Sequence, residues 1–91
     1  MTRTVRVALL QLPAFAIEDA AASLAHTLRR IDEAAAQKPD IIALPEATYP
    51  AYFIGGTMPP EAPSIAEAME AFAGRAKQHG VWIAAGMALD D

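Results

Sequence analysis

The sequence predicts a small α/β domain in which parallel strands alternate with crossover helices. Three apolar runs of strand character occur at residues 5–12, 41–44 and 81–89. Between them, apolar residues recur every three or four positions, which is helical spacing. The order strand, helix, strand, helix, strand favours neighbouring parallel strands with right-handed connections, because each helix returns the chain to the same end of the sheet.

The first strand and the first helix are separated by a proline. Residues 5–12 (VRVALLQL) alternate at first and then become wholly apolar, and Pro13 ends this strand because proline has no N–H for a ladder. A helix follows, which Pro39 ends. Its predicted buried stripe is spaced four, three, four, three and four residues apart: Ile17, Ala21, Leu24, Leu28, Ile31 and Ala35.

The second strand is the centre of the prediction. Residues 41–44 (IIAL) form an apolar run without alternation, which is typical of a strand buried on both faces of a sheet. Pro45 ends the strand. Glu46 therefore lies just past the carboxyl end of a central strand, where open α/β sheets place their ligand crevices.

The second helix has clear start and stop signals. The preceding segment, residues 54–63, is rich in glycine and proline and is expected to be irregular. Ser64 followed by Glu67 is a capping box, and Gly80 is a helix-ending glycine. The predicted buried stripe of this helix consists of Ile65, Met69, Phe72 and Ala76.

Composition limits the size and the partners of this chain. Its 91 residues allow one small domain, and a hydrophobic fraction of 54% suggests apolar surface left over for a partner. A net charge of −4 without a basic stripe argues against nucleic acid. The absence of cysteine excludes disulfides, thiolate metal sites and a cysteine nucleophile within these residues.

We expect a cytoplasmic protein without membrane association. No segment approaches the roughly 18 continuous apolar residues of a membrane span. Arg3 and Arg6 precede an apolar stretch, as in a signal peptide, but Gln11 and Pro13 interrupt that stretch.

Glu46 is the strongest candidate for chemistry. A glutamate at a strand end is usually a solvated loop residue, but Pro45 fixes the chain before it and Tyr49, Tyr52 and Phe53 follow closely enough to exclude water. Desolvation raises the pKa of a carboxyl group and suits it to general-base catalysis. The two tyrosines are candidates for substrate binding, with packing at the edge of the core as the alternative.

The other candidates have simpler explanations. His26 falls on the polar side of its helix, and His79 lies in a last helical turn, where an imidazole favours the helix dipole. Gly55-Gly56 lacks the spacing and the helix start of a phosphate loop. The acidic residues of the helices are expected to be solvated.

Several segments resemble the opening third of the nitrilase superfamily, the carbon-nitrogen hydrolases. They are VRVALLQL, PDIIALPEATYPAY and VWIAAGMAL, and Leu44-Pro45-Glu46 is the most specific part. The resemblance implies that Glu46 is the general base of a Glu-Lys-Cys triad. The family pattern commonly continues to Gly-Tyr, where this chain has Ala51-Tyr52.

The resemblance places the catalytic lysine and cysteine beyond Asp91. Lys38 and Lys77 do not substitute, because both precede strands and should lie at the edge of the sheet opposite Glu46, about 20 Å away along the strand. We therefore interpret residues 1–91 as one partial domain that ends before the triad is complete. The 91-residue chain alone is expected to be catalytically inactive.

The complete protein implied by the resemblance is a four-layer αββα sandwich, of which this chain is the β-α-β-α-β beginning. It would hydrolyse a small-molecule amide, carbamoyl compound or nitrile without a metal or organic cofactor, and we expect a homo-oligomer. Amide and nitrile substrates both stay open. The alternative is a non-catalytic α/β interaction module that binds a partner through its apolar face.

Overall fold

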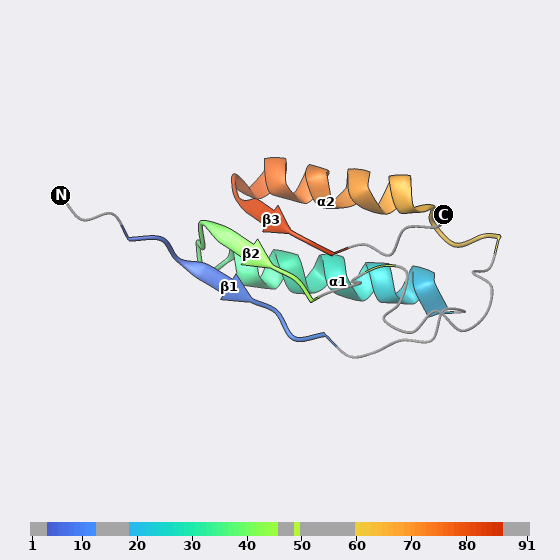
Figure 1. Ribbon diagram of the computed structural model, residues 1–91, viewed down its shortest axis with the longest axis horizontal. Helices are drawn as coiled ribbons and strands as arrows, with labels where there is room; N and C mark the ends of the chain where they lie inside the picture. The colour runs from blue at the N-terminus through green and yellow to red at the C-terminus, as the bar shows by residue number, and fades with distance from the viewer. Residues whose placement is uncertain (1–3, 13–18, 46–48, 50–59, 87–91) are drawn as a thin grey trace.

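The computed structural model describes residues 4–12, 19–45, 49 and 60–86. Two helices and three strands alternate along the chain, as the sequence predicts (Figure 1). They are β1 (Val7–Leu9), α1 (Ala20–Ala35), β2 (Ile41–Ala43), α2 (Ile65–His79) and β3 (Trp82–Ala84). The strands are shorter than the apolar runs, because each keeps only the three residues that are paired in register. Residues 87–89 of the predicted third strand lie outside the described residues.

The three strands form a parallel sheet in which β2 is central, in the order β1-β2-β3. Ile42 of β2 is level with Ala8 on one side and Ile83 on the other. The hydrogen bonds continue past the carboxyl end of the ladder, where the Leu44 N–H donates to the Ala84 carbonyl over 2.8 Å. The central strand is therefore held on both sides up to the residue before Pro45.

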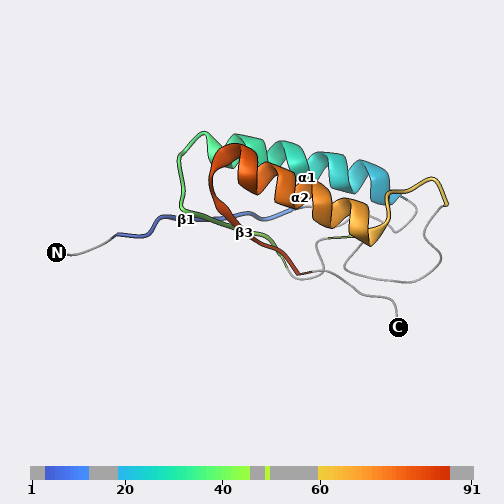
Figure 2. The ribbon, with the colours of Figure 1, turned by 90° about the horizontal axis from the view of Figure 1, so that it is seen from above.

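Both helices lie on the same face of the sheet and run antiparallel to the strands (Figures 1 and 2). Each helix consequently begins at the end of the molecule where the strands finish. Residues at the middle of the strands, above all Ile42, point into the layer between sheet and helices. The buried hydrophobic core consists of Ala20, Leu24, Ile31, Ile42, Tyr49, Ala68 and Phe72.

The predicted signals of α2 are confirmed. The Ser64 side chain accepts from the Glu67 N–H over 3.1 Å, while the Ser64 N–H donates to the Glu67 carboxylate over 3.0 Å. This capping box satisfies two donors at the helix start. Gly80 ends the helix with φ at 63°, a left-handed conformation in which glycine avoids the strain of a side chain.

The buried stripes of the helices differ in phase from the prediction. In α1 the small polar residues Ser23 and Thr27 are buried, whereas Ala21 is exposed. The Thr27 hydroxyl donates to the Ser23 carbonyl over 2.9 Å, so its burial leaves no unpaired hydroxyl. In α2 the predicted core residue Met69 is 54% exposed, and Ala68 is buried in its place.

The sheet face that points away from the helices is apolar and open to solvent. Leu9 and Trp82 are both 78% exposed and Val7 is 51% exposed. Of residues 41–44, only Ile42 is fully buried in this 91-residue chain, so the burial on both faces that the apolar run predicts is not reached by the described residues alone. Strand alternation is the physical reason: neighbouring residues point to opposite faces, and helices cover one of them.

Three charged or titratable side chains join the two helices. The same carboxylate oxygen of Asp32 in α1 lies 3.0 Å from Arg75 Nε and 2.8 Å from His79 Nε2, both in α2. The hydrogen bond with His79 lowers the pKa of Asp32 from its ordinary value of 3.8, partial burial opposes this shift, and the charge of Arg75 adds to it. The Asp32 side chain remains 40% exposed, so it is partly solvated as expected, but it also pairs with α2. His79 lies in the last turn of α2 as predicted, and its contact with Asp32 is an additional feature.

The Asp32 cluster should make stability depend on acid pH. Because the folded-state pKa of Asp32 lies below the unfolded value, its contribution is present above that unfolded value and is lost as pH falls through the folded pKa. We expect Asp32→Asn to lower the free energy of unfolding near neutral pH by about 0.5–1 kcal/mol, since the pair is partly exposed. Urea titrations at several pH values measure this.

The neighbouring carboxylate is the control for this prediction. Glu33 pairs with Arg30 on the surface of α1, and its side chain is 62% exposed. Glu33→Gln should change stability less than Asp32→Asn does. Equal losses from the two variants would contradict a specific role of the interhelical cluster.

The open sheet face should cause self-association of the 91-residue chain. We expect the weight-average mass in sedimentation to rise above 9.6 kDa with concentration, because apolar surface is removed from water when two such faces meet. Leu9→Glu should reduce this association, whereas Gln78→Glu, which adds the same charge on an exposed position of α2, should not. A wild-type chain that stays monomeric and melts sharply would contradict the expectation.

Candidate functional site

The carboxyl end of β2 is fixed by hydrogen bonds from both neighbouring chain segments. The Ala43 carbonyl accepts from the Leu10 N–H over 3.0 Å, and the Leu44 N–H donates to Ala84. Pro45 follows and is half-buried. Glu46 is the next residue and lies outside the described residues, so its role as a general base stays a prediction that rests on its place directly after this strand.

Tyr49 is described, and it is a core residue. Its side chain has no exposed surface and belongs to the same buried cluster as Ile42 and Phe72. Its hydroxyl donates to the carbonyl of Pro63. Burial raises the pKa of Tyr49, and the charge of Glu67 adds to this, so the hydroxyl keeps its proton and stays a donor at neutral pH.

The structure thus favours the core alternative for Tyr49. Direct contact of this tyrosine with a substrate stays a prediction, as does the substrate-binding role of Tyr52, which lies outside the described residues. Sequence reasoning found Tyr49 but not its partner Pro63. The partner is 14 residues away in the chain, and no local pattern encodes that distance.

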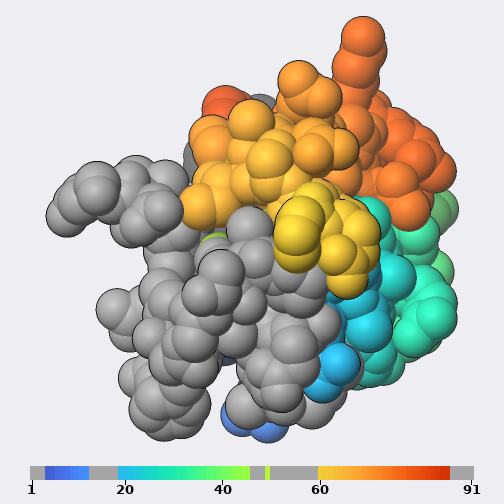
Figure 3. All heavy atoms as spheres, turned by 90° about the vertical axis from the view of Figure 1, so that its right-hand side faces the viewer, coloured from blue at the N-terminus to red at the C-terminus, as the bar shows by residue number. Residues whose placement is uncertain are grey.

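The acceptor of the Tyr49 hydroxyl lies at the start of α2. Pro63 directly precedes Ser64, the residue whose capping box begins the helix. Figure 3 looks onto this end of the molecule, where the first residues of α2 (yellow to orange) lie beside the start of α1 (light blue). Tyr49 therefore connects the segment after β2 with the start of the second helix.

The two lysines lie at the other end of the sheet, as predicted. Lys38 is in the turn before β2, with φ at 56°, and Lys77 is in the last turn of α2. Both positions are at the amino ends of the strands. Both lysines therefore lie at the end of the sheet opposite Pro45 (Figure 1).

Comparison with known families decides the assignment. The family model described as carbon-nitrogen hydrolase matches residues 6–90. The chain belongs to this family. The match confirms the resemblance to the nitrilase superfamily that the segments around Glu46 suggest. No curated protein and no solved structure matches the chain in the same comparisons.

The three-stranded parallel sheet with two helices is consistent with part of a carbon-nitrogen hydrolase fold. Among the described residues no group of three or more side chains is arranged to bind a metal ion. No helix in the described part of the chain is long and apolar enough to span a membrane.

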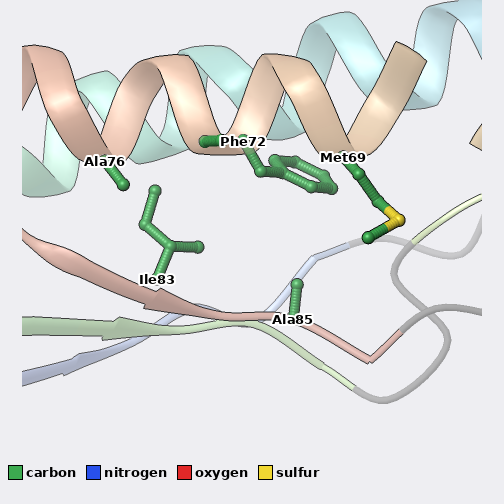
Figure 4. A pocket seen from close by; sticks show the side chains of 6 residues that line it. Met69, Phe72, Ala76, Ile83 and Ala85 are labelled. Atoms are coloured by element: carbon green, nitrogen blue, oxygen red, sulfur yellow. The ribbon is translucent and has the colours of Figure 1, made fainter. Parts of the chain in front are cut away.

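An apolar groove lies between α2 and β3 in the described part of the chain. This groove has a volume of about 240 Å³ (Figure 4). Its lining residues are apolar: Met69, Phe72, Ala73, Ala76, Ile83 and Ala85. None of these six described side chains can donate a proton, accept one or act as a nucleophile at carbon.

Proposed function

We propose that this chain is the N-terminal part of a hydrolase that cleaves the carbon-nitrogen bond of a small non-peptide amide, carbamoyl compound or nitrile. The observation that carries this proposal is the family match over residues 6–90. The fold supports it, because the described central strand leads directly to Leu44-Pro45-Glu46, the most specific part of the resemblance.

Glu46 is the general base of the proposed Glu-Lys-Cys triad. In the hydrolysis of an amide, Glu46 takes the proton of the cysteine thiol, whose sulfur forms a bond with the carbonyl carbon. The carbon-nitrogen bond then breaks as the proton passes from Glu46 to the leaving amine. Water, deprotonated by Glu46, then attacks the thioester carbon, the carbon-sulfur bond breaks, and the proton returns from Glu46 to the cysteine sulfur as the acid leaves. The lysine and the cysteine come from chain beyond residue 91 in this proposal.

The open sheet face supports the layered architecture. Parallel sheets are normally covered on both faces, and here helices cover one face only. We propose that a second sheet of the complete enzyme packs on the face that bears Leu9 and Trp82, giving the αββα sandwich. The complete enzyme is proposed to be a cytoplasmic homo-oligomer that uses no metal or organic cofactor.

A second candidate function is a non-catalytic α/β interaction module. The exposed apolar face of the sheet and the apolar groove beside Met69 favour it, because such surfaces mark binding sites for other chains. The two candidates differ in one simple observation. An enzyme requires that the reading frame supplies a lysine and a cysteine at the ends of further strands, whereas an interaction module does not.

The function is tested first at Glu46 in the complete enzyme. We expect Glu46→Gln to keep the fold and to lower kcat by about 10²- to 10⁴-fold, because the amide cannot accept a proton. Initial rates of ammonia or amine release measure this, with the exposed Glu33→Gln on α1 as the matched control. Unchanged turnover in Glu46→Gln would remove this residue from the mechanism.

Tyr52 tests the predicted substrate pocket. If its ring lines the pocket, Tyr52→Ala should change KM or the preference among acyl groups more than it changes the melting temperature. Kinetics with a series of amides of increasing acyl size, together with thermal unfolding, separate the two effects. A large loss of stability with unaltered kinetics would instead assign Tyr52 to the core.

A further inference from the structure

We propose that Tyr49 is a positioning residue for Glu46: the hydrogen bond from its hydroxyl to the Pro63 carbonyl fixes the segment that carries the general base. This inference rests on the proposed function of Glu46. It differs from a substrate-binding role, because the side chain of Tyr49 has no exposed surface.

The hydroxyl of Tyr49 is the first reason for the proposal. Every other member of the buried hydrophobic core is purely apolar, so a phenylalanine would fill the same space. A buried hydroxyl requires a hydrogen-bond partner, and this one finds the carbonyl of Pro63. The phenol therefore connects Tyr49 to the residue that precedes the capping box of α2.

The rigidity of the acceptor is the second reason. Pro63 has a fixed φ angle, and the next residue, Ser64, is held in place by reciprocal hydrogen bonds with Glu67 of 3.0 and 3.1 Å. Because of these constraints, the Pro63 carbonyl has the fixed orientation of the α2 start. The Tyr49 hydroxyl, which donates to this carbonyl, is therefore held in a fixed position relative to the helix layer.

The short distance along the chain is the third reason. Three residues, Glu46 to Thr48, separate Pro45 from Tyr49, and Pro45 follows a strand end held by the Leu44 to Ala84 hydrogen bond. Consecutive α-carbons are about 3.8 Å apart, so the α-carbon of Glu46 lies within about 11 Å of that of Tyr49. A segment this short, fixed at both ends, transmits a shift of Tyr49 to the general base.

The test uses the complete enzyme and the variant Tyr49→Phe, which removes the hydroxyl and keeps the ring. We expect kcat to fall by about 10- to 100-fold, with KM changed less than about twofold, since small misplacement of a catalytic group costs this much in rate. The control is Thr27→Val, which removes another buried hydroxyl donating to a backbone carbonyl, 2.9 Å away in α1. It should leave kcat unchanged.

A double variant separates positioning from general destabilisation. If Tyr49 acts through Glu46, Tyr49→Phe should lower kcat in the wild type but have little further effect in Glu46→Gln. Independent losses that multiply in the double variant would overturn the positioning role while leaving the proposed function intact. An unchanged kcat in Tyr49→Phe would do the same. An unchanged kcat in Glu46→Gln would overturn both.

A second variant serves if Tyr49→Phe does not fold. Ser64→Ala removes the acceptor of the Glu67 N–H and loosens the other end of the same connection, while the ring of Tyr49 stays in place. We expect a smaller fall in kcat, again absent in the Glu46→Gln background. A Ser64→Ala enzyme that is less stable but has wild-type kcat would overturn the proposal.

Discussion

The hydrogen bonding of β2 on both of its edges is the constraint on which the rest of this structure depends. A parallel strand cannot pair with its neighbours through tight turns, so each pairing requires a helix that returns the chain. The two helices therefore lie on the same side of the sheet and start where the strands finish. The arrangement directs the end of β2, and with it Leu44 and Pro45, toward the start of α2.

The same topology covers one face of the sheet only. The interhelical cluster around Asp32 and the capping box at Ser64 hold the helix layer together, but neither can remove Leu9 or Trp82 from water. Burial of apolar surface stabilises the folded state by about 25 cal/mol per Å². The apolar side chains on the uncovered sheet face do not contribute this free energy of folding. This is the physical argument for the proposed second sheet on the face that bears Leu9 and Trp82.

The features that sequence reasoning found are those encoded over a few residues. The capping box of Ser64 and Glu67, the left-handed Gly80 and the end of β2 before Pro45 follow from neighbours in the chain. Two kinds of feature were not predictable. The hydrogen bond between Asp32 and His79 joins residues that are 47 positions apart in the chain. Thr27 can be buried because its hydroxyl donates to a carbonyl of its own helix, and the spacing of apolar residues carries no information about such a bond. Glu46 was predicted as the general base from its position after the strand and from the family resemblance, and its role stays a prediction because Glu46 lies outside the described residues.

The two tyrosines after β2 were equivalent in the sequence, but only Tyr49 lies within the described residues, where its side chain is buried. A general base is effective when its position is set before the substrate binds, since ordering one residue costs about 1–2 kcal/mol of backbone entropy. In the proposed role of Tyr49, this entropy is lost when the protein folds and not when the substrate binds, because the ring is buried in the core and the hydroxyl is hydrogen-bonded to Pro63. In the proposed function, a Tyr49 that is buried in this way leaves recognition of the acyl group to other side chains. Tyr52 stays the predicted aromatic candidate for that role.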